Sequence, residues 1–254
     1  MVSEKGTGLK PYSKTDHPML PEPKYIRFKF RKVGDLQFIS HLDLQKAMAK
    51  VLVRAKAPLW YSKGFNPHPK LIFALPLSVG AQSECEYLDV RVERAIPPLE
   101  LMEHINNELT EELRFLDAYY AETKLEDIYW AQYDFIIKTA GADENLAHKI
   151  ENILTAEQVI ILKKAKDKYK KIFFKEIDIA SYVRDVFVKF EDGAIKINLK
   201  LSASINQTHP HINPENIVTM LKDKLGVLQG DAMAEQYDII RTRIFFEDAQ
   251  TDFR

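Results

Sequence analysis

The chain has 254 residues, enough for two domains of average size or one large domain. Its 36 basic and 37 acidic residues give a net charge of −1, so any nucleic-acid binding must come from a local patch and not from an overall positive field. A single cysteine, Cys85, excludes an internal disulfide framework and the all-cysteine zinc and iron–sulfur sites.

The first residues predict a flexible segment. Residues 1–24 contain four prolines among mainly polar residues, which is typical of a tail without a core of its own. They lack the apolar stretch of a signal peptide, and no apolar run in the chain approaches the roughly 18 residues of a membrane span. We therefore expect a cytoplasmic protein without a membrane segment.

Residues 25–124 predict a first unit with the element order β-α-β-β-α-β, the ferredoxin-like arrangement. Apolar and basic residues alternate in the first strand. A helix begins at Ser40, buries Leu44, Met48, Val51, Leu52 and Ala55, and ends at Pro58. The other expected elements are strands over 71–77, 87–92 and 113–121 and a helix from Pro97.

Residues 125–254 predict a second unit with a similar element order but no sequence repeat of the first. We expect strands over 133–139, 159–164 and 237–246, a hairpin over 186–201, and helices over 144–154 and from Asn213 to Gly226. Residues 165–182 form an insertion of undefined structure. The predicted fold is therefore α+β, with two ferredoxin-like units packed together.

Basic residues share one face of several predicted strands. Arg27, Lys29 and Arg31 alternate with buried positions in the first strand, as do Lys196 with Lys200 and Arg241 with Arg243 in the second unit. An open sheet with basic and aromatic side chains is a known RNA platform. Tyr61, Phe65, Tyr119 and Tyr120 could supply stacking, although no RNP-type motif is present. Alternatively, these cations only provide the polar outer face of a sheet.

A second group of candidates combines a helix start with a proline-rich loop. His41 and Asp43 follow Ser40 at the start of the first helix, where free N–H groups favour anions. His68 lies in "KGFNPHPK" (63–70), between Pro67 and Pro69. We expect His68 to face the His41 helix end. The predicted anion- or RNA-binding residues are Arg27, Lys29, Arg31, Ser40, His41, Asp43, Tyr61, Lys63, Phe65, Asn66, His68 and Lys70.

The same residues allow two other interpretations. His41 and His68 would be the acid–base candidates if the protein cleaved RNA or a phosphoester without a metal. Alternatively, Asp43 only caps the helix, His41 is solvated, and the prolines stiffen a connection.

Other potential sites are weaker. His209 and His211 flank a proline and have no acidic or cysteine partner nearby, so a loop is favoured over a metal site. Cys85 stands between two glutamates, which disfavours a reactive thiolate and favours a core residue. No Walker loop, G-x-G-x-x-G or G-x-S-x-G motif is present. No cofactor and no metal are expected.

Four segments within residues 38–90 together resemble a bacterial family known as radical-SAM-linked proteins. They are His41-Leu42-Asp43, YSKGFNPHPK (61–70), Pro76-Leu77 with Val79-Gly80, and EYLD (86–89). Members of that family are fused to, or encoded beside, cobalamin-binding radical SAM proteins. This chain lacks the three cysteines of a radical SAM cluster, so the resemblance implies a partner or substrate-handling module for such an enzyme.

These observations lead to three hypotheses. The first is a non-catalytic accessory protein that binds ribosomal or transfer RNA through the basic sheet face and the His68 loop and presents it to a radical SAM partner. The second is a metal-independent RNA-processing enzyme that uses His41 and His68. The third is a module that binds only proteins.

Overall fold

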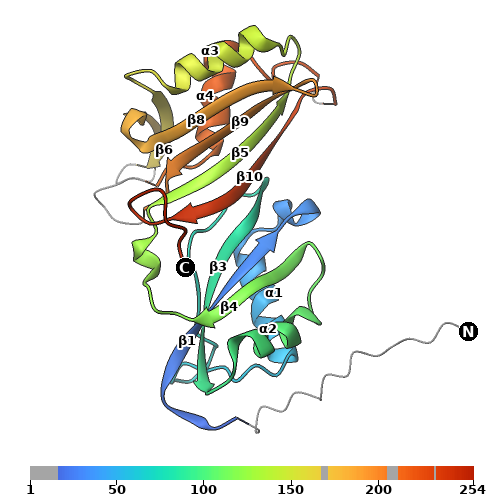
Figure 1. Cartoon of the computed structure of the whole chain (residues 1–254), viewed down its shortest axis with the longest axis vertical. Coiled ribbons are helices and arrows are strands. Elements are labelled where there is room, and N and C mark those ends of the chain that lie inside the picture. The colour runs from blue at the N-terminus through green and yellow to red at the C-terminus, as the bar shows by residue number, and fades with distance from the viewer. Residues whose placement is uncertain (1–16, 167–170, 205–210, 232) are drawn as a thin grey trace, which may run out of the picture. The chain divides into compact units, whose positions relative to one another are not determined.

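The computed structural model describes residues 17–166, 171–204, 211–231 and 233–254 (Figure 1). The fold is mixed α+β: the described residues form a large, mostly antiparallel sheet, a separate two-stranded sheet and four α-helices. The predicted α+β class is confirmed, while the ferredoxin-like topology of the two units stays a prediction.

The chain divides into two compact units that interleave along the sequence. Unit 1 comprises residues 1–31, 41–74 and 86–122, and unit 2 comprises residues 32–40, 75–85 and 123–254. The C-terminal part of unit 2 thus begins close to the boundary expected after residue 124. Sequence reasoning did not expect two segments of the first half, 32–40 and 75–85, to belong to unit 2.

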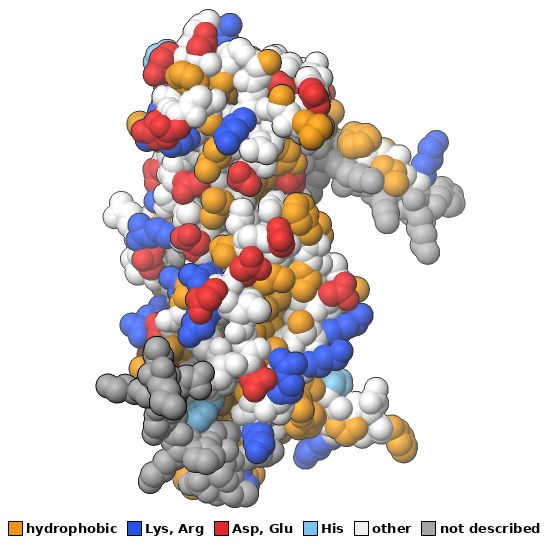
Figure 2. Space-filling view, turned by 90° about the vertical axis from the view of Figure 1, so that its right-hand side faces the viewer, with side chains coloured by type: hydrophobic (Ala, Val, Ile, Leu, Met, Phe, Trp, Pro, Cys, Tyr) orange, Lys and Arg blue, Asp and Glu red, His pale blue; other side chains and the backbone are white. Residues whose placement is uncertain are grey.

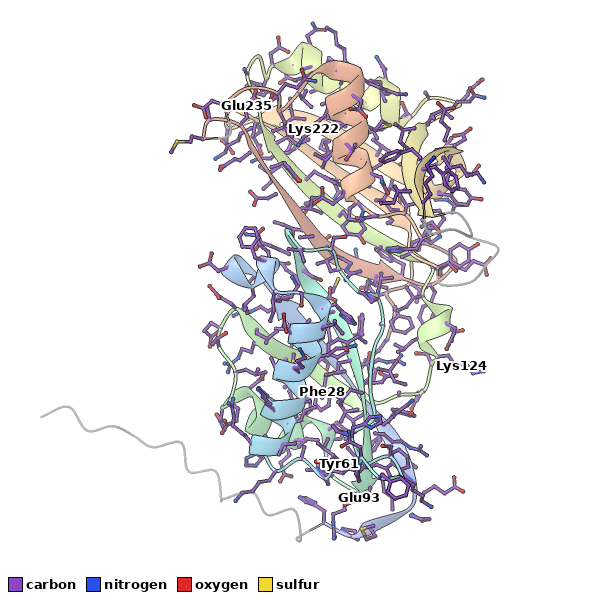
Figure 3. All side chains as sticks on the ribbon, turned by 180° about the vertical axis from the view of Figure 1, so that it is seen from behind. Phe28, Tyr61, Glu93, Lys124, Lys222 and Glu235 are labelled. Atoms are coloured by element: carbon purple, nitrogen blue, oxygen red, sulfur yellow. The ribbon has the colours of Figure 1, made fainter. Side chains whose placement is uncertain are left out.

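Unit 1 contains two helices and the strands that they pack against. Its elements are β1 (Met19–Lys32), α1 (His41–Arg54), β2 (Leu71–Phe73), β3 (Ala81–Arg94), α2 (Pro98–Asn106) and β4 (Leu113–Tyr120). The first five residues of β3, 81–85, belong to unit 2. Hydrogen-bonded neighbours run in the order β4-β1-β3, and β2 pairs antiparallel with the C-terminal half of β3. Figure 3, seen from behind, shows α1 in front of these strands.

The core of unit 1 follows the alternation seen in the sequence. Phe28 and Phe30 of β1 are fully buried, and the Phe28 ring stacks on Phe115 of β4 at 4.5 Å between centroids. Leu44 and Met48 of α1 are buried as the helical spacing predicts, and so are the other residues of that stripe. Since apolar burial stabilises by about 25 cal/mol per Å², this layer accounts for much of the unit's stability.

Unit 2 contains the remaining strands and two helices. Its elements are β5 (Trp130–Lys138), α3 (Glu144–Leu154), β6 (Ile160–Lys166), β7 (Ile172–Asp178), β8 (Val183–Glu191), β9 (Ala194–Ser202), α4 (Glu215–Leu225) and β10 (Gln236–Phe245). The strand order is β10-β5-β9-β8. The N-terminal residues of β3, Ala81–Ser83, pair with β10 in parallel.

In the part of the chain that the structure describes, three short 3₁₀ helices connect these elements. They are Gly34–Phe38, Leu125–Asp127 and Ala180–Tyr182.

Strand β6 does not join the main sheet of unit 2. It pairs with β7 from Ile160↔Asp178 to Lys166↔Ile172, and the two strands form the separate sheet. The prediction that 159–164 is a strand is confirmed. Within the insertion predicted over 165–182, Ile172–Asp178 is the other strand of this hairpin.

Two further expectations need correction. Residues 1–16 lie outside the described residues, but the expected tail is wrong for residues 19–24, because β1 begins at Met19. The carbonyl oxygens of His17 and Pro18 accept hydrogen bonds from Arg94 and Ala95, which fixes the entry to β1. The strand predicted over 71–77 is shorter in the structure, where β2 ends at Phe73.

Candidate nucleic-acid interface

The proline-rich loop is a closed turn held by backbone hydrogen bonds. Trp60 donates to the carbonyl of Arg91 on β3, Lys70 donates to Trp60, and Ser62 donates to His68. Tyr61 and Pro69 form an isolated bridge at the base of the turn. The loop therefore has a defined shape at the C-terminal end of β3, where Figure 3 places Tyr61 near Glu93.

His68 takes part in this local network. Its Nδ1 lies 3.0 Å from Ser62 Oγ and 3.3 Å from the carbonyl oxygen of Asn66, and its backbone N–H donates to Ser62 Oγ. Gly64 turns the chain with a φ of +144°, which disfavours other residues there. His68 is therefore exposed on a loop whose backbone is fixed by hydrogen bonds within the loop.

His41 lies elsewhere on unit 1. It is the first residue of α1, its Nε2 is 2.9 Å from Gln45 Nε2, and its ring meets Phe73 edge to face at 5.3 Å. Pro69, beside His68, instead lines a groove with Lys50 and Arg54. These residues lie about 13–20 Å along α1 from His41, at 1.5 Å per residue. The contacts of Pro69 therefore do not support the expectation that His68 faces the His41 helix end, which stays a prediction.

The exposed side chains around the loop combine cations with aromatic rings. We call Lys50, Tyr61, Lys63, Phe65, His68 and Lys70 the loop surface; all six are exposed, and Phe65 is fully exposed. Among the described residues, Lys50, Lys63 and Lys70 form no ion pair. Their charges are therefore available to an external anion. Asn66 is also exposed on this loop.

A charge pattern in the sequence marks this region and was missed by strand-by-strand reasoning. Residues 44–83 include six lysines and arginines and no aspartate or glutamate. One of these cations, Arg54, pairs with Glu108 of unit 1 at 3.0 Å, and Lys46 lies 3.4 Å from Asp43 at the start of α1. A 40-residue stretch without an acid is thus a stronger signal than alternating cations on one strand.

The predicted basic ladder of β1 is not an open cationic face. Arg27 is fully buried and donates two hydrogen bonds to Asp89 of β3, at 2.7 and 2.9 Å. Arg31 binds the carbonyl and carboxylate of Glu111. Lys29 is half-buried and Ser40 is likewise half-buried. Arg27 therefore serves the interior of unit 1, and the prediction that it contacts RNA is not supported.

The cations of unit 2 are also engaged. Lys196 pairs with Glu191 and Asp192, Lys200 pairs with Asp185, and Arg243 pairs with Asp252. Arg241 is fully buried and donates to the carbonyl of Leu75. Hydrogen bonds from Lys196 and Lys189 lower the pKa of Glu191 to about 2. Figure 2 shows basic and acidic side chains side by side over most of the face in view.

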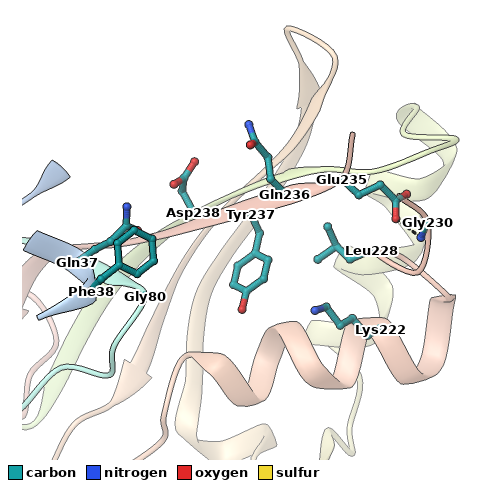
Figure 4. Close-up of a pocket in the computed structure, with 10 residues that line it drawn as sticks. All are labelled: Gln37, Phe38, Gly80, Lys222, Leu228, Gly230, Glu235, Gln236, Tyr237 and Asp238. Atoms are coloured by element: carbon teal, nitrogen blue, oxygen red, sulfur yellow. Dashed lines mark hydrogen bonds between the residues drawn. The ribbon is translucent and has the colours of Figure 1, made fainter. Parts of the chain in front are cut away.

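Unit 2 contains a cleft that sequence reasoning did not find. Its volume is about 490 Å³, and Lys222 of α4, Tyr237 of β10 and Phe38 contribute to its lining (Figure 4). Tyr237 donates a hydrogen bond to Glu215 at 3.0 Å, and burial raises the pKa of Tyr237 to about 12. The Lys222 ammonium lies 5.0 Å from the centroid of the same ring.

Three polar side chains of this cleft, Lys222, Glu235 and Tyr237, have partners within unit 2. Glu235 accepts hydrogen bonds from Ala140 N, Thr139 Oγ1 and Gly230 N, which lower its pKa. Lys222 interacts with the Tyr237 ring, and Tyr237 with Glu215. These contacts join α4, β5 and β10, so we assign them a role in holding unit 2 together.

A family model described as "Uncharacterized protein conserved in bacteria (DUF2344)" matches residues 25–214. The chain belongs to this family. In this DUF2344 member the matched range includes the whole loop surface and the β6–β7 hairpin. It ends just before α4, so the cleft at Lys222 and Tyr237 is only partly within it.

No curated protein matches the chain. Among solved structures, a protein described as "Crystal Structure of an Unknown Protein from Galdieria sulphuraria" is 8% identical, with 87% of this chain and 99% of that chain covered. Its TM-score is 0.26.

Three other points concern the described residues of the DUF2344 chain. No helix there is long and apolar enough to cross a membrane, and no group of three or more His, Cys, Asp and Glu side chains could hold a metal ion. Cys85 is buried and its Sγ lies 3.7 Å from the carbonyl oxygen of Arg241, so its prediction as a core residue is confirmed. His209 lies outside the described residues.

Proposed function

We propose that this protein is a non-catalytic, RNA-binding accessory protein of a radical SAM enzyme and that it contacts RNA through the loop surface. The observation that carries the RNA part is the fully exposed Phe65 among lysines that no carboxylate of the described residues neutralises. The radical SAM part rests on the resemblance of residues 38–90. Ribosomal and transfer RNA are the candidate targets, and a cytoplasmic location accords with them.

The chemistry of the loop surface suits unpaired RNA. An exposed aromatic ring offers a stacking face to any base, and this is worth about 1–3 kcal/mol per base. Lys63 and Lys70 are on the same loop and can reach phosphates on either side of a stacked base. Since the backbone of the loop is held by its own hydrogen bonds, little ordering would be needed on binding.

This proposal replaces the basic sheet face with the loop surface as the RNA contact. Arg27 and Arg241 are buried, and displacing Asp89 from Arg27 would cost more than a phosphate contact returns. Arg31, Lys196, Lys200 and Arg243 already have carboxylate partners. The enzyme hypothesis is not favoured, because His41 contacts Gln45 at the start of α1, whereas His68 contacts Ser62 within its own loop.

We also propose the ferredoxin-like topology for each unit. Unit 1 has the element order β-α-β-β-α-β and the strand order β4-β1-β3-β2. Unit 2 has the corresponding order β10-β5-β9-β8 once the β6–β7 hairpin is set aside. The two orders support the expectation drawn from the sequence.

Equilibrium binding to RNA at several salt concentrations tests the RNA part. Lys63→Gln/Lys70→Gln should lower the affinity and flatten the dependence of log K on log salt, by about 0.7 for each phosphate of a single strand that is no longer neutralised. Phe65→Ala should weaken binding roughly tenfold or more without changing the slope, because stacking releases no counterions.

Matched variants in unit 2 serve as controls. Lys149→Gln/Lys224→Gln removes two exposed lysines from α3 and α4, and Phe187→Ala removes an exposed ring from β8. These changes should leave the affinity unchanged. Absence of RNA binding at low salt, or equal reductions in the loop and control variants, would refute the proposal.

Co-purification with a cobalamin-binding radical SAM protein from the same cells tests the second part. The two proteins should form a complex that survives Phe65→Ala, because the loop surface is assigned to RNA and not to the enzyme. A complex that Phe65→Ala abolishes, with no RNA binding by either protein, would favour the module that binds only proteins.

A further inference from the structure

The β6–β7 hairpin of unit 2 is anchored at its base. Val159 and Ile161 are buried, β6 contacts α4, and Asp178 accepts hydrogen bonds from the backbone N–H groups of Val159 and Ala180. The fixed base therefore sets the position of the strands that lead away from it.

Beyond the base, the described apolar side chains are exposed. Leu162 is 45%, Phe173 46% and Phe174 64% exposed, and Ile172 is similar. In the strand register Phe174 shares a face with Ile172 and Leu162, whereas Phe173 is on the opposite face with Ile161. The ribbon thus presents aromatic rings on both of its faces.

The same segment is strongly basic in sequence. Residues 163–175 contain seven lysines and one acid. Lys171 and Lys175, which flank the three exposed apolar residues of β7, are exposed themselves. Seven lysines within 13 residues complement a dense line of negative charges such as a phosphate backbone.

We infer that the β6–β7 hairpin is a second RNA-contacting element, in which Lys171 and Lys175 bind phosphates and Phe173 and Phe174 stack on unpaired bases. The inference rests on the proposed function and adds a second contact of the same chemistry, outside residues 38–90, which carry the resemblance to radical-SAM-linked proteins. Its target class is RNA with an unpaired loop or bulge, into which a two-stranded ribbon can insert.

The distribution of apolar residues favours RNA over a lipid bilayer. A bilayer surface meets one face of a ribbon, so an interfacial element concentrates its apolar residues on that face. Here both faces carry an exposed phenylalanine. Bases splayed from an RNA loop can stack on rings from two sides, whereas a flat surface cannot contact both.

RNA binding by three variants of the full chain tests the inference. Phe173→Ala/Phe174→Ala should weaken binding to a stem-loop RNA roughly tenfold or more, with an unchanged salt slope. Lys171→Gln/Lys175→Gln should lower the slope by about 1.4 on a single strand, because two phosphates are no longer neutralised. Phe187→Ala, on β8 outside the hairpin, should bind as the parent does. Thermal unfolding verifies that each variant is folded.

The outcomes separate this inference from the proposed function. Weaker binding in both the loop and the hairpin variants supports both contacts. If only Lys63→Gln/Lys70→Gln and Phe65→Ala weaken binding, the loop surface stands and the hairpin inference is refuted. If the parent chain binds no RNA but co-sediments with vesicles of anionic lipids through Phe173 and Phe174, the RNA assignment of the hairpin is refuted as well.

Discussion

The pair of Arg27 and Asp89 shows that a basic residue in an alternating strand can be buried in an ion pair and not exposed to solvent. Both side chains are almost fully buried, and the two hydrogen bonds between them are of charge-assisted length. Removing one partner from such a pair leaves a charge buried without its counterion. Asp89, which belongs to the EYLD segment, therefore contributes to the stability of unit 1.

We expect Asp89→Asn to lower the free energy of unfolding by about 3–5 kcal/mol, as measured by urea denaturation. The matched control is Asp252→Asn in the Arg243–Asp252 pair, which has the same two-bond geometry but is more than half exposed. That change should cost about 0–1 kcal/mol. Equal effects of the two changes would contradict the assignment of Arg27 to the core.

Glu235 provides a pH-dependent contribution. Hydrogen bonds from Ala140, Thr139 and Gly230 lower its pKa in the folded chain below the ordinary value of 4.5. A carboxyl with a lowered folded-state pKa stabilises the fold above its unfolded pKa, and this contribution is lost as the pH falls through the folded pKa.

Glu235→Gln should therefore reduce the melting temperature at neutral pH, where the carboxylate is the better acceptor. The difference between the two chains should shrink as the pH falls below the ordinary carboxyl pKa of 4.5 and the parent carboxyl becomes protonated. Thermal unfolding followed by circular dichroism over this range measures it. A difference that does not change with pH would show that the charge of Glu235 is irrelevant.

At this scale the sequence predicts which side of a strand a residue occupies but not what covers that side. The alternating pattern predicted that Phe28 and Phe30 are buried, which is confirmed, and that Arg27 lies on the opposite face of the strand. The acceptor, Asp89, is 62 residues away. Because the pairing depends on strand order, alternation alone could not distinguish a buried ion pair from an exposed ladder.

At the scale of elements, periodicity predicted most helices and strands with small errors at their ends. Helix α1 was expected from Ser40 and begins at His41, and α3 was expected over the residues that it occupies. The β6–β7 hairpin was only half predicted, because the lysine-rich stretch between its strands has no apolar alternation. Its second strand has apolar residues on both faces, which period-two reasoning rejects.

Since the hairpin is anchored at its base, we expect the fold to tolerate its shortening. Leu162 and Glu176 are paired across the ribbon, so a two-residue Asn-Gly turn can replace residues 163–175. The melting temperature should change by only a few degrees, roughly a 1 kcal/mol effect, while RNA affinity falls. An insoluble or unfolded product would show that the distal hairpin is required for the fold.

At the scale of the molecule, the near-neutral net charge conceals a segregated distribution. Residues 44–83 and 163–175 are strongly basic, so the rest of the chain is acidic overall. Composition alone therefore gave no sign of nucleic-acid binding, although two local segments carry the charge that such binding needs. Counting charged residues over stretches of about 15–40 residues reveals these basic segments. Periodicity, in contrast, is recognised over shorter stretches.

The interleaving of the two units also belongs to this scale. Strand β10 pairs in parallel with Ala81–Ser83, and the buried Arg241 of the same strand donates to the carbonyl of Leu75. Both partners come from the first half of the chain but belong to unit 2. A chain divided near residue 124 would therefore leave unit 2 without the strand residues Ala81–Ser83 and without the Leu75 carbonyl that accepts from Arg241.

We predict that residues 123–254 expressed alone will not form a stable, cooperatively folded domain. Without 75–85, β10 exposes unpaired backbone groups along an edge, and the Arg241 guanidinium is deprived of a buried acceptor, each of which is costly. Circular dichroism melting of the fragment should show no sharp transition, and co-expression with residues 17–122 should restore one. A fragment that melts cooperatively at the temperature of the full chain would contradict this, and would make the boundary expected from the sequence the physical one.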